Sequence, residues 1–105
     1  MRVDGTNLAM VRGDTEAISV TCSTPFDTGD TVTFSIRKKP TTGLVLQKVV
    51  TEFTDGVALI SIFPADTAEL AFGKYVYDIQ VNWANGTVKT IVEKSEFWVK
   101  DEVTF

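Results

Sequence analysis

Large apolar residues alternate with polar ones along most of this chain, and the alternation is clearest in residues 70–83. Successive side chains of a β-strand point to opposite faces of a sheet, so every second residue of such a stretch shares one face. The pattern predicts a long strand with one apolar face, which needs a second apolar layer to cover it. The residues predicted to point inward from this strand are Tyr75, Tyr77, Ile79, Val81 and Trp83.

Weaker versions of the same pattern predict further strands, separated by turn-forming residues. Asp55-Gly56 and Asn85-Gly86 are typical of hairpin turns, because Gly and Asn accept the positive φ angles that tight turns require. The stretch 44–53 has mixed phase, which is typical of an edge strand or a bulge. The predicted strands are residues 7–11, 15–22, 31–37, 44–53, 57–63 and 87–99.

Three stretches carry additional detail. Residues 57–63 are nearly all apolar, so we expect them to be covered on both faces over part of their length. The apolar parity changes part-way along residues 87–99, which predicts a bulge near residues 93–96. Residues 64–70 begin with Pro, which suits a first helical position, and they predict one short helical turn.

The succession of elements predicts the fold class. About seven strands, with turn signals roughly every eight to twelve residues, indicate an all-β, immunoglobulin-like antiparallel β-sandwich with Greek-key connections. The spacing of Leu70, Gly73 and Tyr75 is similar to a tyrosine corner, in which the phenol bonds a backbone group just upstream. The 105 residues suit a single domain, 1–105, with residues 1–5 and 101–105 as loose arms.

Charge and hydropathy limit the partners. Ten basic and fourteen acidic residues give a net charge of −4, whereas nucleic-acid binding requires a concentrated positive surface, so we expect no nucleic-acid partner. The one close basic run, Arg37-Lys38-Lys39, is interpreted as a solvated turn, with a phosphate or anion contact as the alternative. No apolar run approaches the ~20 residues of a membrane span, and we expect neither a signal peptide nor a transmembrane segment.

Residues that usually carry catalysis are scarce. Histidine, the commonest general base and transition-metal ligand, is absent from the sequence. The single cysteine, Cys22, shares parity with Ile18 and Val20, so a core thiol is favoured over a nucleophile. We therefore expect no enzyme activity, no catalytic residue, no cofactor and no metal.

A few residues are candidates for surface contacts instead. Trp98 has the opposite parity to its apolar neighbours and is predicted to be exposed, and Asp78 is predicted to point outward from the long strand. Asp27 and Asp30 lie in a loop rich in turn formers, where calcium ligation is the alternative to an ordinary turn. The candidate contact residues are Trp98, Asp78, Asp27 and Asp30.

Two tripeptides also allow two interpretations. Arg12-Gly13-Asp14 matches an integrin-binding motif, and Asn85-Gly86-Thr87 matches a glycosylation sequon. Both lie between predicted strands, where Gly, Asp and Asn are ordinary turn residues, and we favour the turn in each case.

Several segments together carry a resemblance to a known group of proteins. They are residues 73–80, 85–91 and 97–104 in the C-terminal half, with residues 12–15 and 34–37 before them. In this order they resemble small β-sandwich proteins of tailed phages and prophages, which include the N-terminal domain of baseplate upper proteins and related tail- or capsid-associated modules.

The resemblance implies a non-enzymatic structural module of a phage or prophage particle. Such a module acts through protein–protein contacts with other virion proteins and with copies of itself, and it lies in the virion, or in the host bacterial cytoplasm before assembly. The alternative function is a carbohydrate-binding or adhesion β-sandwich module, which Trp98, Tyr77 and the Asp27–Asp30 loop would support; a glycan partner is the less favoured interpretation.

Overall fold

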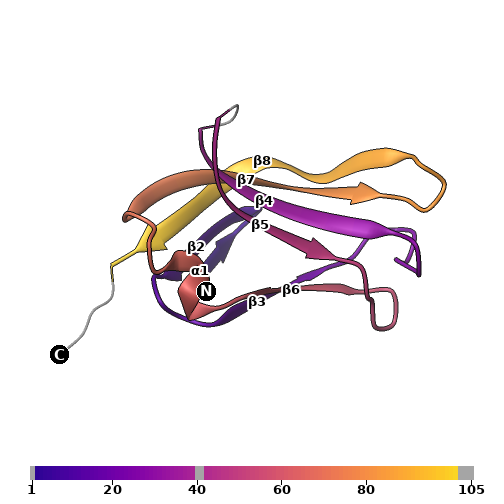
Figure 1. Ribbon diagram of the computed structural model, residues 1–105, viewed down its shortest axis with the longest axis horizontal. Coiled ribbons are helices and arrows are strands. Elements are labelled where there is room, and N and C mark those ends of the chain that lie inside the picture. Colours follow the sequence, from indigo (N-terminus) through magenta and orange to yellow (C-terminus); the bar gives the residue numbers. More distant parts are fainter. Residues whose placement is uncertain (1, 40–41, 102–105) are drawn as a thin grey trace.

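The computed structural model of the protein describes residues 2–39 and 42–101. These residues form mostly β-strands and one short helix (Figure 1). In chain order the elements are β1 (Arg2–Asp4), β2 (Asn7–Val11), β3 (Glu16–Val20), β4 (Thr31–Lys39), β5 (Thr42–Val50), β6 (Ala58–Ile62), α1 (Pro64–Thr67), β7 (Gly73–Asn82) and β8 (Val88–Lys100). The predicted all-β class and the predicted helical turn are confirmed.

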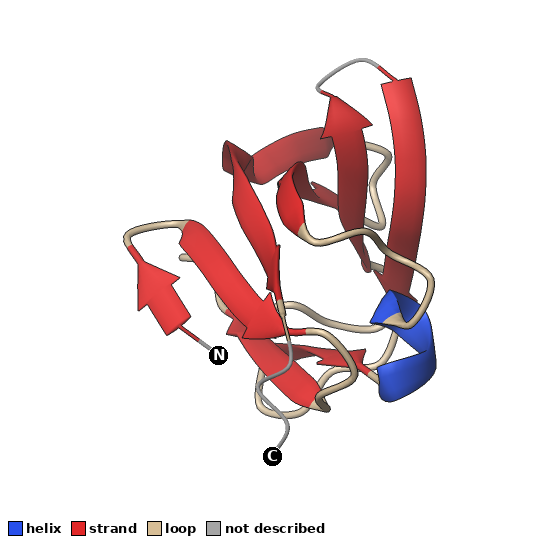
Figure 2. Cartoon of the chain, turned by 90° about the vertical axis from the view of Figure 1, so that its left-hand side faces the viewer, coloured by secondary structure: helices blue, strands red, loops and turns tan. Residues whose placement is uncertain are grey.

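The strands form two sheets that face each other (Figures 1 and 2). The larger is six-stranded, in the order β1-β2-β8-β7-β4-β5, and the smaller consists of β3 and β6. The larger sheet is mixed, because β2 runs parallel to β8 while its other neighbouring strands are antiparallel. The chain is elongated, with principal dimensions of 48 × 29 × 24 Å.

The core lies between the two sheets, and the alternation in β7 supplies its centre. Tyr75, Tyr77, Ile79 and Val81 are buried as predicted, while the intervening residues are partly or fully exposed. The inward residues of β4 and β6 are equally buried, and they pack against this row. Each large apolar side chain buried in this way contributes about 1.5–3 kcal/mol, so the pairing of these faces is what specifies the two-layered arrangement.

Two aromatic groups divide the core along its length. Phe34, Tyr77 and Phe97 lie near the middle, with ring centroids 5.4–6.2 Å apart. Near the end that carries the β7–β8 hairpin, Phe26 packs on Phe53 at 5.3 Å and on Trp83 at 5.8 Å. Trp83 is therefore a core residue at the edge of the apolar layer, as its parity predicts.

The predicted irregularities are also present. β5 is an edge strand, and its register with β4 shifts where Ile36 pairs with Leu46 and Arg37 pairs with Leu44. The register of β7 and β8 shifts between Tyr77 and Ile79, which places the predicted bulge in residues 93–94 of β8, and it shifts again between Ile79 and Gln80. One bulge reverses the inside-outside phase, which accounts for the mixed parity of β5. In β8 the second shift restores the phase, so Val88 is exposed and does not face the core.

Several expectations differ from the structure. The larger sheet is mixed and not wholly antiparallel, and Arg37-Lys38-Lys39 belongs to strand β4 and does not form a turn. Residues 2–4 form β1 instead of a loose arm, because they pair antiparallel with β2. Residues 58–62 are covered on one face only, and Leu59 is exposed on the other. The Asp55-Gly56 turn is present, with both residues at positive φ, but β5 and β6 on either side of it belong to different sheets. Of the predicted C-terminal arm, residues 102–105 lie outside the described residues.

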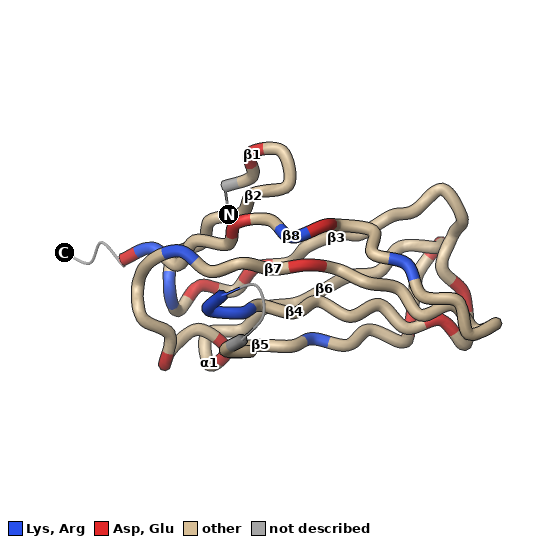
Figure 3. Tube along the Cα trace, turned by 90° about the horizontal axis from the view of Figure 1, so that it is seen from above, with Lys and Arg blue, Asp and Glu red and all other residues tan. Residues whose placement is uncertain are grey.

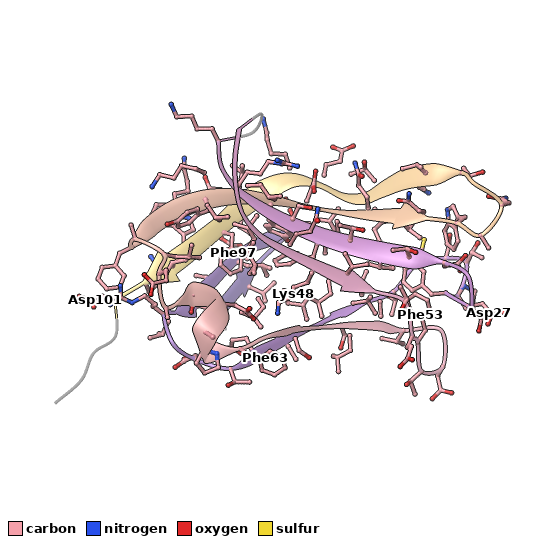
Figure 4. The ribbon with its side chains drawn as sticks, in the orientation of Figure 1. Asp27, Lys48, Phe53, Phe63, Phe97 and Asp101 are labelled. Atoms are coloured by element: carbon pink, nitrogen blue, oxygen red, sulfur yellow. The ribbon has the colours of Figure 1, made fainter. Side chains whose placement is uncertain are left out.

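An ion pair joins the edge strand β5 to α1 across the open side of the two sheets. Lys48 points inward from β5, and its Nζ lies 2.8 Å from Asp66 Oδ2 and 5.3 Å from the centroid of Phe63 (Figure 4). Asp66 Oδ2 also accepts the Phe63 backbone N–H at 2.7 Å, at the N-terminus of α1. The carboxylate therefore caps the helix and anchors β5 at the same time.

Candidate functional site

The outer face of the six-stranded sheet is the face turned away from β3 and β6, and it carries the alternate, polar residues of β4, β7 and β8. The inner face of the same strands is occupied by the core. A partner can therefore reach this sheet only through its outer face, its edge strands or its end loops. Two of the four predicted contact residues, Trp98 and Asp78, lie on the outer face.

Trp98 lies beside a shallow hollow between β8 and the β1–β2 hairpin. The hollow has a volume of about 180 Å³, and Asp4, Asn7 and Leu8 form part of its wall. Trp98 is half-buried, its Nε1 donates to Glu96 Oε1 at 3.1 Å, and Lys100 Nζ lies 4.7 Å from its ring centroid. The indole is thus held in one orientation by its own strand, with apolar surface facing the hollow.

Asp78 lies in a narrow groove on the same face, opposite the bulge in β8. It pairs across the sheet with Ser35 of β4, and Arg37 and Lys94 line the groove beside it. The groove has a volume of only about 50 Å³. Asp78 is half-buried, so the predicted outward orientation is present but much of the side chain is covered by its neighbours.

Asp27 and Asp30 have different environments, although they share one loop. Asp27 is exposed, at the same end of the molecule as Phe53 (Figure 4). Asp30 is only 7% exposed; its Oδ2 accepts the Asp27 N–H and its Oδ1 accepts the Ala84 N–H, both at 2.9 Å. The prediction of Asp30 as a surface contact is therefore wrong: its carboxylate joins this loop to the β7–β8 hairpin.

Metal ligation was the alternative interpretation of this loop. Within residues 2–39 and 42–101, no three His, Cys, Asp or Glu side chains lie close enough together to hold a metal ion.

Of the predicted corner residues, Leu70 lies between α1 and β7, and Gly73 and Tyr75 lie at the start of β7 itself. Tyr75 Oη donates a hydrogen bond to the backbone carbonyl of Ala71 at 2.8 Å, and Leu70 packs against the core. The neighbouring Tyr77 Oη donates to the backbone carbonyl of Thr6, and burial raises the pKa of this phenol. Both tyrosine hydroxyl groups thus bind backbone carbonyls of connecting segments. The hydroxyl group of Tyr77 is therefore not exposed for binding a glycan, as the carbohydrate-binding alternative would require.

The Arg12-Gly13-Asp14 turn is held against the body of the protein. The Arg12 guanidinium lies 4.1 Å from the ring centroid of Phe72, and the Gly13 N–H donates to the buried Thr67 Oγ1 at 3.0 Å. The Asp14 N–H closes the turn on the Val11 carbonyl at 3.1 Å. The tripeptide thus has a structural role between β2 and α1. Cys22, likewise, is half-buried and packs against the core.

The free edge of β5 is a feature that the sequence pattern indicated only in part. Mixed phase predicted an edge strand, and the structure adds that Leu44, Val45 and Val49 are exposed along it, with Val49 at 56%. Lys48 is the only charged residue of this strand, and it points inward to Asp66. The exposed side of β5 is therefore uncharged and largely apolar.

Sequence reasoning missed a second feature, a cleft at the base of the β4–β5 hairpin. It has a volume of about 430 Å³, and lysines from three strands meet there. The residues that line this basic cleft are Asn7, Lys38, Lys39, Lys74, Val76, Lys94, Ser95 and Glu96. Only Lys38 and Lys39 form a run in the sequence; Lys74 and Lys94 reach the cleft through strand pairing.

No family model matches the chain, and no curated protein or solved structure is significantly similar to it. The resemblance to phage modules therefore stays a prediction. The described part of the chain contains no helix that is long and apolar enough to cross a membrane.

Proposed function

We propose that the chain is a non-enzymatic structural module of a phage or prophage particle, which acts through protein–protein contacts that include contacts between its own copies. The observation that carries the protein-contact function is the free edge of β5, with its exposed Leu44, Val45 and Val49. The order of sequence segments that resembles phage tail, baseplate and capsid-associated modules supports the setting in a virion.

An edge strand presents a row of unpaired backbone N–H and C=O groups, and a strand from another chain can extend the sheet by pairing with them. Natural monomeric proteins commonly limit this with a lysine or a proline on the edge, with a β-bulge or with an inward-pointing charge. β5 has a bulge at Val45, but Leu44, Val45 and Val49 stay exposed and apolar along it. In β5 the single charge, Lys48, is turned inward and paired with Asp66 at 2.8 Å. The backbone edge is thus flanked by apolar side chains, which favours the addition of a partner strand.

The proposed architecture is an immunoglobulin-like Greek-key sandwich. The order β8-β7-β4-β5 in one sheet, with β3 and β6 in the other, supports this assignment. The bond from Tyr75 to the Ala71 carbonyl has the geometry of a tyrosine corner. Edge and loop contacts are the usual means by which such a scaffold carries function.

Association through β5 is tested with two matched variants, Val49→Lys on β5 and Val88→Lys at the start of β8. Both valines are 56% exposed, so each variant adds the same charge to an equally exposed position. Val49→Lys is expected to weaken self-association about fivefold or more, because a lysine must be desolvated at the new strand pair. Val88→Lys is expected to change it less than twofold. Sedimentation equilibrium of the full chain measures both.

Equal effects of the two variants, or a wild-type chain that stays monomeric at millimolar concentration, would contradict contacts between copies through β5. The proposed location in a virion has its own test. The phage particle whose genes neighbour the gene of this chain is purified and studied by mass spectrometry and electron microscopy. We expect the chain in the purified particle in a fixed copy number. A particle that lacks it at every position would refute the structural role in a virion.

Trp98 favours a second candidate function, carbohydrate binding. Its half-buried indole borders the 180 Å³ hollow together with Asp4 and Asn7, and an aromatic face beside polar groups is a common arrangement for stacking a sugar ring. A glycan array probed with the wild type and with Trp98→Ala tests it. Binding that Trp98→Ala abolishes would support this function, and an array without any Trp98-dependent signal would exclude it.

A further inference from the structure

The basic cleft lies where the β4–β5 hairpin meets the outer face of the larger sheet. The hairpin rises from the sheet on the side away from β3 and β6 (Figures 1 and 2). Lys38 and Lys39 come from the hairpin side, Lys74 comes from β7 and Lys94 from β8. The lysines of the cleft therefore come from three different strands, and they are brought together only when the sheet forms.

The charges of the cleft are unbalanced. Four lysines and one glutamate line it, although acidic residues outnumber basic ones in the chain as a whole. Figure 3 shows basic positions on β4, β7 and β8 at this end of the sheet, with acidic residues between them on β7 and β8. The lysines outnumber the acidic residue in the lining and therefore repel one another, so a bound anion would stabilise this region.

The single acid of the cleft is already engaged. Glu96 Oε1 accepts the Trp98 Nε1–H at 3.1 Å, and Glu96 Oε2 lies 3.7 Å from Lys74 Nζ. Lys38 Nζ lies 5.1 Å from the centroid of the Tyr75 ring, on the inner side of the sheet, so its ammonium group is already engaged there. Among the residues that the structure describes, Lys39 and Lys94 have no acidic side chain within 4.0 Å. These two lysines are therefore the ones that can donate to a ligand.

We propose that this cleft binds a ligand with two or more neighbouring phosphate or sulfate groups. Such oxyanions accept several hydrogen bonds, and ammonium groups arranged around a cleft can each donate up to three. The volume of about 430 Å³ exceeds that of a single phosphate ion and suits a short polyanion. Ser95 and Asn7 also line the wall; Ser95 Oγ donates to the Glu93 carbonyl, and Asn7 Oδ1 accepts the Glu96 N–H.

The cleft does not include the β5 edge, so the oxyanion site goes beyond the proposed assembly function. It borders the hollow beside Trp98, with which it shares Asn7 and Glu96. The two proposals can be tested independently. Val49→Lys can leave self-association unchanged while the cleft still binds an anion, and the cleft can fail to bind an anion while self-association depends on Val49. β4 contributes Lys38 and Lys39 to the lining of the cleft, and it pairs on its other side with β5.

The test is isothermal titration of the full chain with two defined probes, sodium tripolyphosphate and sucrose octasulfate, at low ionic strength, where exposed charges are least screened. Uncharged sucrose is the control ligand. We expect saturable binding of at least one charged probe, none of sucrose, and a dissociation constant that rises steeply with added salt. Binding of tripolyphosphate alone would identify phosphate groups as the source of the anion, and binding of sucrose octasulfate alone a sulfated sugar.

Matched variants on β8 distinguish a site from general attraction. Lys94 lines the cleft and Lys89 does not, yet both are exposed lysines of the same strand. Lys94→Gln is expected to weaken probe binding about threefold to fivefold, and Lys39→Gln with Lys94→Gln about tenfold, because each removes one charged donor. Lys89→Gln is expected to stay within twofold of the wild type.

Three results would overturn the oxyanion site. One is the absence of saturable binding by either probe. Another is an equal loss of affinity in Lys94→Gln and Lys89→Gln, which would show that net charge alone attracts the probes. The third is duplex DNA that binds more tightly than both probes and depends on Lys94, because the cleft would then be a nucleic-acid contact.

Discussion

Asp30 shows how one side chain can hold two distant loops together. Its two carboxylate oxygens accept backbone N–H groups from Asp27 and from Ala84, and the side chain is almost fully buried. A turn-rich loop with two aspartates is compatible with a calcium site as well as with this arrangement. The sequence cannot distinguish the two, because the decisive partner, the Ala84 N–H, lies 54 residues away in the chain.

Replacement of Asp30 by alanine is expected to destabilise the protein by about 2 kcal/mol, because two partly buried N–H groups lose their acceptor. Asp27→Ala is the control. The Asp27 side chain is exposed, and among the described residues it accepts the N–H of its neighbour Thr28 alone, so its loss is expected to cost about 0.5 kcal/mol or less. Urea unfolding measures both, and equal costs would show that Asp30 does not join the two loops.

Gly56 is a second residue whose role the structure makes specific. Its φ is +76°, and a Cβ there would lie 2.6 Å from Pro25 Cβ and 3.2 Å from Pro25 Cα. Gly86 also has positive φ, at +92°, but a Cβ there would meet no heavy atom within 4 Å. Gly86 is thus required only for the backbone conformation of its turn, whereas Gly56 is required both for the conformation and for the close contact with Pro25.

Gly86→Ala is expected to cost about 1 kcal/mol, which is the usual penalty for an alanine at positive φ. Gly56→Ala is expected to cost about 2 kcal/mol or more, because Pro25 must also move away from the new methyl group. Thermal and urea unfolding of the two variants provide the comparison. Equal destabilisation by the two substitutions would mean that Pro25 can move away from the new methyl group with no loss of stability.

At the scale of elements, β5 and α1 depend on each other through Lys48 and Asp66. Burial raises the pKa of the Asp66 carboxyl, but the hydrogen bonds from Lys48 and from the Phe63 N–H, together with the Lys48 charge, outweigh burial and hold the pKa below its ordinary value of 3.8. A carboxyl whose pKa is lower in the folded state stabilises that state above pH 3.8, and this contribution disappears as the pH falls through the folded-state pKa.

Asp66→Asn is therefore expected to destabilise the protein by about 1 kcal/mol at pH 7. The difference in unfolding free energy from the wild type should stay constant down to about pH 5 and shrink below the ordinary aspartate pKa of about 4. Asp55→Asn, in an exposed turn, is the control and should show little difference at any pH. A gap between wild type and Asp66→Asn that persists unchanged at pH 2 would contradict a role for the carboxylate charge.

The same elements show what the sequence pattern can specify. Parity identified the buried face of β7 and the edge character of β5, because both follow from side-chain alternation within one segment. It failed for residues 58–62, where the outward Leu59 is exposed because no third layer covers the two-stranded sheet. It also failed for residues 2–4, whose pairing with β2 depends on backbone hydrogen bonds that carry no hydropathy signal.

At the scale of the whole molecule, the candidate sites depend on contacts between remote segments. The hollow beside Trp98 requires β1, β2 and β8, and the basic cleft requires β2, β4, β7 and β8. Individual residues such as Trp98 and the Arg37-Lys38-Lys39 run could be singled out from the sequence. Their neighbours could not, because strand order and register between distant segments are not encoded in any local pattern.

The parallel pair of β2 and β8 has a consequence for how the protein forms during synthesis. Leu8 pairs with Phe97, and Val11 pairs with Lys100, so an early strand has its partner at the opposite end of the chain. Such long-range closure is slow compared with local hairpin formation. Until residues 88–100 have been synthesised, β2 can pair with β1 but lacks its partner on the other side. Completion of the larger sheet is thus a late event, and the interval before it is when the nascent chain is most exposed to incorrect pairing.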